Sequence, residues 1–497
     1  MKDQKTGGIA LSYLNILLGL VMNLVLTPLL IASLSEGTYS LYRVMQSLAG
    51  PLTLLNLGLG TVAARCTAGA RDDNRENTLA MTLVAALVLA GLAMALGLGL
   101  GLLIPRLYGG NFSPAEIALA GRLFPMLAAS AAVNIVTDVF RGCAVGNGRF
   151  YLRYGSRTIY YLTKPVLTIL CLKLGFGAFG AALAELAVSG SQLLLFVLTL
   201  REKIHLHRWD SAEFRAIFGF SAAVLLQAVV NQVNNNADLM LLGALEPDKA
   251  VITMYSGALT IFSVYNSMLS VFSGVYFPRA VELVNRGCSG RELTDFVIGP
   301  GRIQGTIALG VLGGFALFGR EFMGLWLGEP YADGWKIALA LMIPMTIPLV
   351  QTLCLSILDA RLQRLHRSAV LCAMAVGNVA VSVVLMGPLG HWGAVLGTVL
   401  SLILGHGVLM NRYYRKKLNL EPGRMLTEIF RGNLPCALGA VALCMPLTNI
   451  PGLFLGKCGL FCLIYGLLLW WFGWNRQEKQ AIRNLWGRRE NHGNDTE

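Results

Sequence analysis

The stretch that decides the fold lies at residues 214–243 and reads FRAIFGFSAAVLLQAVVNQVNNNADLMLLG. It is apolar and long enough to cross the roughly 30 Å hydrocarbon core of a bilayer as a helix, yet it carries a polar stripe. At 3.6 residues per turn the stripe falls within about 60° on one side of the helix, and it consists of Gln227, Asn231, Asn234 and Asp238. Because an unpaired polar group in hydrocarbon costs several kcal/mol, the stripe must face another helix or a water-filled cavity. An amide interface between helices is the simpler interpretation, and the ionisable Asp238 favours the cavity.

The composition of the chain is that of a membrane protein. Of its 497 residues, 55% are hydrophobic and only 13% are charged, and 56 are Gly, which lets membrane helices approach closely. Apolar runs of about 20 residues recur from end to end, so the sequence predicts an all-α polytopic membrane protein without a soluble domain. The first run, residues 7–32, is longer than the apolar core of a signal peptide and lacks a cleavage site, so we expect it to be retained.

Fourteen membrane-spanning helices are expected, and the loops between them indicate their orientation. Loops after even-numbered helices are rich in Lys and Arg, whereas loops after odd-numbered helices are short and poor in cations. This pattern predicts a protein of the cytoplasmic membrane with both termini in the cytosol. The net charge of +13 has its source in these loops and does not indicate a nucleic-acid partner. The expected helices are 7–32, 37–62, 78–104, 115–141, 157–174, 177–200, 214–243, 248–278, 298–320, 334–358, 368–387, 390–411, 425–446 and 453–474.

No cofactor or metal is expected. The ten Cys include no Cys-x-x-Cys pair, and several lie in the basic loops, where a reducing cytosol keeps thiols free. The six His form no metal-like cluster. The chain also lacks the phosphate loop of ATPases, the nucleophile elbow of hydrolases and the paired-His helix of metalloproteases. We therefore predict that the protein is not an enzyme.

The chain repeats itself. A shift of 216 residues places Asn15 on Asn231, and a shift of 213 residues places the Gly-x-aromatic-Gly-Ala element at Gly177 on a similar element at Gly390. Two shifts this close predict two parallel six-helix repeats. The expected divisions are residues 1–200 and 201–411 for the repeats, 412–474 for helices 13 and 14, and 475–497 for a cytosolic tail.

The first helix also carries a polar stripe, with spacings of three or four residues. Its members are Ser12, Asn15, Gly19, Asn23 and Thr27. Since equivalent helices of the two repeats carry equivalent stripes, we expect the stripes to face each other across a central cavity, with Asn15 and Asn23 in contact with substrate.

Short motifs resemble those of a known transporter family. The runs Gly37-Thr-Tyr-Ser-Leu-Tyr-Arg and Leu55-Asn-Leu-Gly-Leu-Gly, followed by a basic loop, resemble the second helix of bacterial oligosaccharide flippases (Wzx-like) of the multidrug/oligosaccharidyl-lipid/polysaccharide exporter superfamily. The elements at Gly177 and Gly390 fit the same family. The resemblance implies that the chain moves undecaprenyl-diphosphate-linked oligosaccharide between leaflets by alternating access, for cell-surface polysaccharide biosynthesis. The implied partners are lipid-linked oligosaccharide and membrane lipid, with a polysaccharide polymerase and glycosyltransferases beside them.

Ionisable residues within the expected helices suggest how a diphosphate is held. Arg43 and Lys164 are the expected cationic contacts, since a guanidinium binds such a group in bidentate fashion. The alternatives are that both side chains reach to the headgroups, or that Lys164 pairs with Glu185. The expected substrate-binding residues are Arg43, Lys164, Asn15, Asn23, Gln227, Asn231, Asn234 and Asp238, and the residues expected in ion pairs or in coupling are Glu185, Asp138 and Asp359.

Two other classes fit parts of the sequence. A cation-coupled drug exporter of the same superfamily would carry a buried carboxylate cluster in its first half, where this chain has mainly Asp138 and Glu185. A polytopic glycosyl ligase or polymerase would need a sizeable outer loop, and the longest one here, near residues 320–335, has no recognisable acid–base pair.

Overall fold

The computed structural model describes residues 2–68, 73–202, 204–211, 214–215, 232, 236–361, 364–475 and 478–480. Helices form most of these segments, and no strand occurs among them. Within the same segments, eleven helical stretches are long and apolar enough to cross a membrane. The expected all-α polytopic fold is therefore confirmed. The count of fourteen stays a prediction. The expected spans 157–174 and 248–278 fall on the helices α6 (Phe150–Lys173) and α9 (Lys249–Asn285), which are not among the eleven stretches, and the expected span 214–243 lies largely outside the described residues.

The chain divides into two compact units. The first consists of residues 1–260 and 365–401, and the second of residues 261–364 and 402–497. This division does not test the two expected sequence repeats, residues 1–200 and 201–411, which stay a prediction.

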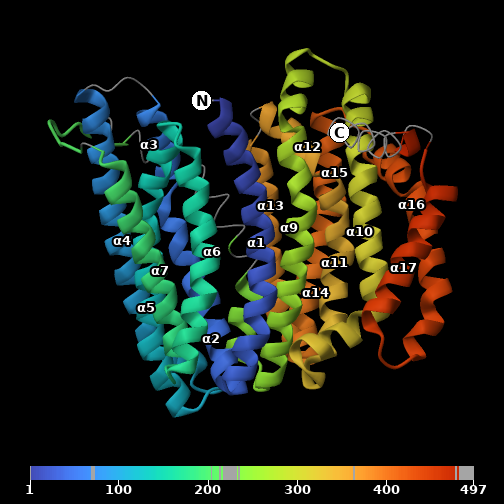
Figure 1. Cartoon of the computed structure of the whole chain (residues 1–497), viewed down its shortest axis with the longest axis horizontal. Coiled ribbons are helices and arrows are strands. Elements are labelled where there is room, and N and C mark those ends of the chain that lie inside the picture. Colours follow the sequence, from blue (N-terminus) through green and yellow to red (C-terminus); the bar gives the residue numbers. More distant parts are fainter. Residues whose placement is uncertain are drawn as a thin grey trace, which may run out of the picture. The chain divides into compact units, whose positions relative to one another are not determined.

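The first unit is built around one long helix, α5 (Pro114–Gly146). It packs against α2, α3, α4 and α7, while α6 packs against both α1 and α7 (Figure 1). The other elements of this unit are α1 (Lys2–Ser33), α2 (Glu36–Ala49), η1 (Gly50–Asn56), α3 (Leu59–Thr67), α4 (Asp73–Tyr108), α6 (Phe150–Lys173), α7 (Gly177–Leu200), the helix Asn236–Leu245, the start of α9 (Lys249–Asn285), α13 (Arg364–Leu389) and α14 (His391–Leu402).

Local signals explain where these helices begin and break. The N-cap Ser113 and Glu116 form a reciprocal capping box at the start of α5. The expected helix 37–62 is interrupted, because Pro51 opens a 3-10 segment and the chain then turns through left-handed backbone. Gly58 takes this conformation, with φ +71°, at no steric cost.

Small residues let α3 and α5 cross closely. A Cβ atom added to Gly142 of α5 would lie 2.0 Å from the carbonyl oxygen of Gly60 on α3, which no side chain tolerates. This close approach is typical of membrane helices, where packing rather than hydrophobicity drives association.

Polar contacts tie the segment that carries Asp238 to the first helices. The ammonium group of Lys249, at the start of α9, lies 2.7 Å from the carboxylate of Glu116 on α5. The Asn111 side chain donates a hydrogen bond of 2.8 Å to the carbonyl oxygen of Ala244. These contacts anchor the helix Asn236–Leu245 within the first unit.

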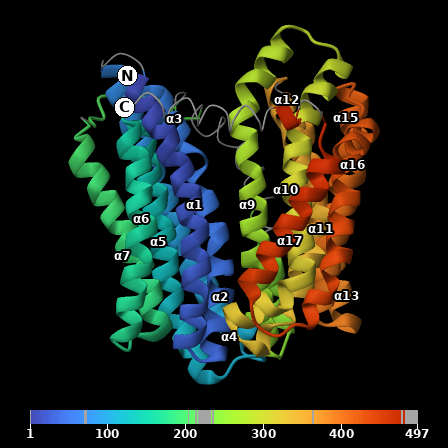
Figure 2. The same ribbon diagram turned by 45° about the vertical axis from the view of Figure 1, so that its right-hand side comes forward.

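The second unit contains the rest of α9 and a group of helices around α10 (Gly290–Leu327). Here α10 packs against α11, α16 and α17, and Figure 2 shows α10, α16 and α17 as neighbouring helices. Phe318, Phe461 and Tyr465 form part of the apolar core between them. The remaining elements are η2 (Glu329–Tyr331), α11 (Gly334–Val350), α12 (Thr352–Ala360), the π-helix η3 (Ile403–Met410), α15 (Asn411–Lys417), α16 (Pro422–Cys444), η4 (Met445–Asn449), α17 (Phe454–Leu468) and the π-helix η5 (Leu469–Gly473).

Two buried cations fasten the last helices to α10. The guanidinium of Arg302 lies 2.7 Å from the Glu478 carboxylate and donates a hydrogen bond of 2.9 Å to the carbonyl oxygen of Gly473. Lys457 of α17 forms an ion pair with Glu321 of α10. Each of these two buried cations thus has a carboxylate partner.

Candidate functional site

Lys164, expected as a diphosphate contact, lies in an ion pair with Glu185 of α7. Tyr160, one turn earlier on α6, donates a hydrogen bond of 2.7 Å to the same carboxylate, and the Lys164 ammonium lies 5.7 Å from the centre of its ring. The exposed fractions of the Lys164 and Glu185 side chains are 23% and 15%. The pair that the sequence offered as an alternative is therefore formed, and it offsets the charge of Lys164.

Arg43, the other expected diphosphate contact, lies on α2 close to the same group. Its Nη1 donates a hydrogen bond of 3.3 Å to Gln46, and Gln46 in turn donates one of 2.9 Å to the hydroxyl of Tyr42. Tyr42 interacts electrostatically with both Arg43 and Lys164. Among the described atoms, the buried Nε of Arg43 has no acceptor, which is uncommon for a buried donor. The structure thus brings the two predicted cations into one neighbourhood.

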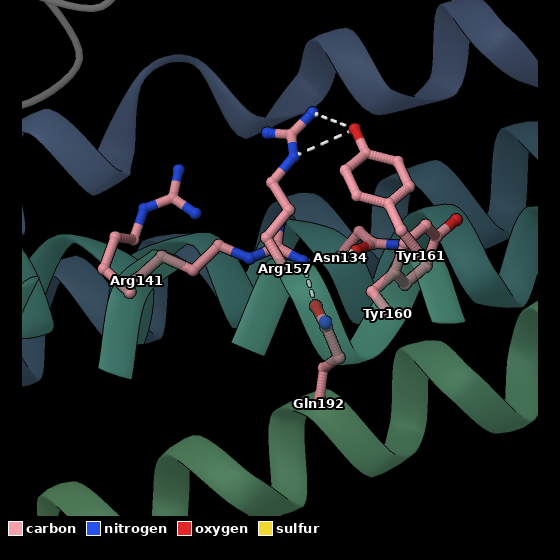
Figure 3. Close-up of a pocket in the computed structure, with 7 residues that line it drawn as sticks. Asn134, Arg141, Arg157, Tyr160, Tyr161 and Gln192 are labelled. Atoms are coloured by element: carbon pink, nitrogen blue, oxygen red, sulfur yellow. Dashed lines mark hydrogen bonds between the residues drawn. The ribbon is translucent and has the colours of Figure 1, made fainter. Parts of the chain in front are cut away.

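A cavity of about 190 Å³ lies between α5, α6 and α7 (Figure 3). Its lining residues are Asn134, Arg141, Arg153, Arg157, Tyr160, Tyr161 and Gln192. The guanidinium of Arg157 donates two hydrogen bonds to the hydroxyl of Tyr161, at 3.1 and 3.0 Å. Nη2 of Arg141 donates to Gln192 at 2.7 Å and to Asn134 at 3.2 Å. We call this space, with its three arginines, the arginine cavity.

The sequence places these arginines only in or next to the basic loop between the expected helices 115–141 and 157–174. The expected helix began at residue 157, whereas α6 begins at Phe150 and includes both Arg153 and Arg157. The signal that could have found them is the spacing of four residues from Arg153 to Arg157 and again to Tyr161, which places the three on one face of a helix. The third arginine, Arg141, comes to the cavity from α5 through the packing of the helices.

Asn15 of α1 joins its helix to α6. Its amide donates a hydrogen bond of 2.8 Å to the carbonyl oxygen of Tyr154, and its oxygen accepts one of 2.8 Å from Thr158. Asn15 is buried, and these two bonds are those of a helix interface. Asn23 is exposed on the same helix. A substrate contact for Asn15 or Asn23 stays a prediction.

Of the central polar stripe, Gln227, Asn231 and Asn234 lie outside the described residues. Asp238 is buried in the first unit, where the hydroxyls of Tyr255 and Thr398 donate hydrogen bonds of 2.6 and 2.8 Å to its Oδ2. Its Oδ1 is buried without a hydrogen-bond partner among the described atoms.

The other two predicted carboxylates, Asp138 and Asp359, lie on α5 and α12. Asp138 of α5 is half-buried, and its Oδ2 lies where α5 meets Gly60 of α3. It interacts with Arg141 and Arg153 electrostatically. The hydrogen bonds of Arg141 Nη2, however, go to the side-chain amides of Asn134 and Gln192. Asp359 lies on α12, and its side chain is outside the described residues. Coupling roles for these carboxylates and for Glu185 stay predictions.

Comparisons with known proteins match this architecture. The sequence model of a family described as polysaccharide biosynthesis protein matches residues 147–336, which include α6 and the α7 helix that line the arginine cavity. The chain is similar in structure to a solved lipid II flippase, MurJ, in an inward closed conformation, with a TM-score of 0.73 and 14% identity over 93% of this chain and 97% of that one. No curated protein matches the chain in sequence.

Two solved multidrug transporters of the MATE family are also similar in structure. The inward-facing one has a TM-score of 0.56 and 20% identity over 82% of this chain and 95% of that one. The outward-facing one has a TM-score of 0.57 and 17% identity over 83% and 96%. Both are described as transporters of the MOP superfamily, and at these identities the likeness concerns the fold.

Proposed function

We propose that this chain, a multi-pass membrane transporter that resembles the bacterial oligosaccharide flippases of the multidrug/oligosaccharidyl-lipid/polysaccharide exporter superfamily, transfers an undecaprenyl-diphosphate-linked oligosaccharide across the cytoplasmic membrane. The direction is from the inner to the outer leaflet, by alternating access, for the biosynthesis of a cell-surface polysaccharide. The observation that carries the proposal is the group of cations on α2, α5 and α6, within a chain that matches a polysaccharide biosynthesis family.

The charge of the proposed substrate determines what the protein must supply along its path. A lipid diphosphate carries about two negative charges, and an unpaired anion in a low-dielectric site costs many kcal/mol. The path of the headgroup therefore needs cations, and forked guanidinium groups suit phosphoryl oxygens because they bind them in bidentate fashion. Arg43, whose Nε lacks an acceptor among the described atoms, has a donor to offer.

The proposed function also implies an orientation in the membrane and partner proteins. We expect both termini in the cytosol, and we expect a polysaccharide polymerase and glycosyltransferases to act on the same lipid-linked substrate. Amides of the central stripe, Asn231 and Asn234 among them, would contact the sugars, whose hydroxyl groups pair with such side chains.

The test is a translocation assay with purified protein in liposomes that contain a lipid-diphosphate oligosaccharide in both leaflets. Liposomes without protein should protect the sugars of the inner leaflet, about half of the total, from a membrane-impermeant glycosidase. Liposomes with protein should lose this protection, because the inner-leaflet sugars become accessible. An unchanged protected fraction with folded protein would refute the proposal.

A second candidate function is cation-coupled drug export. It is favoured by the buried carboxylate of Asp238, since ionisable groups inside a membrane often carry coupling ions. Deletion of the gene separates the two functions: loss of surface polysaccharide with unchanged drug tolerance supports the flippase, and the reverse supports the exporter.

A further inference from the structure

We propose that the arginine cavity between α5, α6 and α7 is a binding site for a diphosphate group, held by Arg141, Arg153 and Arg157. The site is distinct from Arg43 and Lys164. The inference rests on the proposed function for the source of the diphosphate, which is the headgroup of the lipid carrier.

The positive charge of the three arginines is largely uncompensated. Among the described residues, no carboxylate oxygen lies within 4.0 Å of these three guanidinium groups. Lys164 and Arg302, by contrast, do have such partners: Lys164 pairs with Glu185, and Arg302 with Glu478. The longer-range carboxylate of Asp138 balances only one of the three charges. Arg141 and Arg153 are half-buried, whereas Arg157 is exposed. Since half-buried charge calls for a counter-charge, the cavity is suited to an anion.

The donors of Arg157 form a fork that suits an anion. Both Nε and Nη2 of Arg157 converge on one neutral oxygen, the hydroxyl of Tyr161 (Figure 3). This fork is the arrangement that a pair of phosphoryl oxygens would fill better, because hydrogen bonds to an ionised acceptor are roughly twice as strong. Tyr161 thus occupies the donors of Arg157 and competes with the anion for them.

Hydrogen bonds from Arg141 to neutral amides fix the orientation of its guanidinium group. The Gln192 oxygen that accepts from it belongs to a buried side chain, whose own amide nitrogen donates a hydrogen bond of 2.7 Å to the carbonyl oxygen of Ser156. The amides of Gln192 and Asn134 therefore orient the guanidinium without cancelling its charge. Such preorganisation lowers the entropy cost of binding.

The size of the cavity indicates which part of the substrate it takes. Its volume of about 190 Å³ is below the range of pockets that enclose a drug-sized ligand, roughly 300–1,000 Å³. Two phosphoryl groups fit, and a chain of several sugars does not. The site would recognise the linkage of the carrier rather than the identity of the sugars. Tyr160 lines this cavity and also hydrogen-bonds Glu185, so the cavity adjoins the Lys164–Glu185 pair.

The experiment measures binding by calorimetry, with full-length protein in detergent and two probes, inorganic diphosphate and a short-chain polyprenyl diphosphate. Arg141→Gln, Arg153→Gln and Arg157→Gln should each weaken the binding of both probes about ten- to a hundredfold, as expected for a lost charged hydrogen bond. Arg157→Lys should lose less than Arg157→Gln, because it keeps the charge. Tyr161→Phe should bind at least as tightly as the wild type, because it removes the competing acceptor.

The matched control is Arg149→Gln. Arg149 precedes α6, donates a hydrogen bond of 3.0 Å to the carbonyl oxygen of Thr199 and does not line the arginine cavity. It should bind both probes like the wild type. Equal affinity of all three cavity variants and the wild type would overturn the site, as would equal losses in Arg149→Gln. Weaker binding by Tyr161→Phe would overturn its competing role.

This design distinguishes a lipid headgroup from free diphosphate as the ligand. It also tests the binding site separately from the flippase function. Binding of inorganic diphosphate without binding of the polyprenyl probe would overturn the assignment to a lipid headgroup. Normal translocation by the three cavity variants in liposomes would overturn the site and leave the flippase function standing. Site-dependent binding of both probes by a wild type that moves no lipid-linked oligosaccharide would overturn the flippase function and leave the site standing.

Discussion

Lys164 and Arg157 lie two turns apart on the same helix, but their charged groups have different kinds of partner. Lys164 is matched by Glu185, while Arg157 donates only to a neutral hydroxyl. A residue type therefore does not decide whether a cation in a membrane helix is free to bind substrate; its acceptors do. Removing one member of a buried pair is also more harmful than removing both, because the remaining charge is left uncompensated.

The Lys164–Glu185 pair leads to the first prediction. Lys164→Ala and Glu185→Ala should each destabilise the protein, by up to about 3 kcal/mol, and the double variant should recover most of the loss. Thermal unfolding in detergent measures the stability. If Lys164 also contacts the diphosphate, the double variant should be stable and still fail in translocation. A stable double variant with normal translocation would show that the pair is structural only.

Arg43 leads to the second prediction. Arg43→Ala should reduce translocation at least tenfold, the scale of one lost charged hydrogen bond, with the amount of membrane-inserted protein unchanged. Arg43→Lys should restore only part of the rate, because an ammonium group cannot reproduce the bidentate fork. Normal translocation by both variants would mean that Arg43 only anchors α2 at the headgroups.

At the scale of helices, close crossings and amide contacts hold the first unit together. The α3–α5 crossing depends on Gly142, and the α1–α6 contact depends on Asn15. Both features act on α5 or α6, the two helices that supply the three arginines of the cavity. The geometry of the cavity is therefore a product of helix packing at sites away from it.

The glycine crossing provides the third prediction. Gly142→Ala should destabilise the protein by about 1–3 kcal/mol, because the added methyl group has no space at 2.0 Å from the carbonyl oxygen of Gly60. Gly121→Ala on the same helix is the control, since a Cβ there meets no atom within 4 Å. It should be neutral or slightly stabilising, as Ala favours helix more than Gly does. Similar melting temperatures for the two variants would contradict the close crossing.

The central polar stripe provides the fourth prediction, which the sequence makes alone. In a background without native Cys, cysteines placed at Asn231 and Asn234 should react with a water-soluble maleimide, because the stripe is expected to face an aqueous cavity. Cysteines at Val229 and Val233 should react little. Equal labelling of both sets would leave the stripe without functional meaning.

At the scale of the whole molecule, the hydropathy and loop charges define a membrane protein with a predicted orientation. Within the second unit, α11 and α12 separate Asp333 from Arg361, so the two residues bracket one predicted crossing. The loop after an even-numbered helix is expected in the cytosol, and the loop at Asp333 is expected outside.

Reporter fusions test this fifth prediction. A reporter that is active only in the cytosol should be active when fused after Arg361 and inactive when fused at Asp333. The opposite pattern, with both fusions stably produced, would invert the predicted orientation.

The sequence by itself determined that the protein is all-α and polytopic, that motifs near Gly37 and Leu55 resemble those of a flippase family, and that Lys164 and Glu185 were candidates for one ion pair. These features are local, because apolar length, loop charge and short motifs each depend on residues that are close in sequence. Only the tertiary structure decided that Lys164 is paired, that Asn15 bonds α6, and that Arg141 joins Arg153 and Arg157 around one cavity. The physical reason is that a cation's partners come from other helices, so its role depends on how α5, α6 and α7 pack, which a hydropathy pattern does not encode.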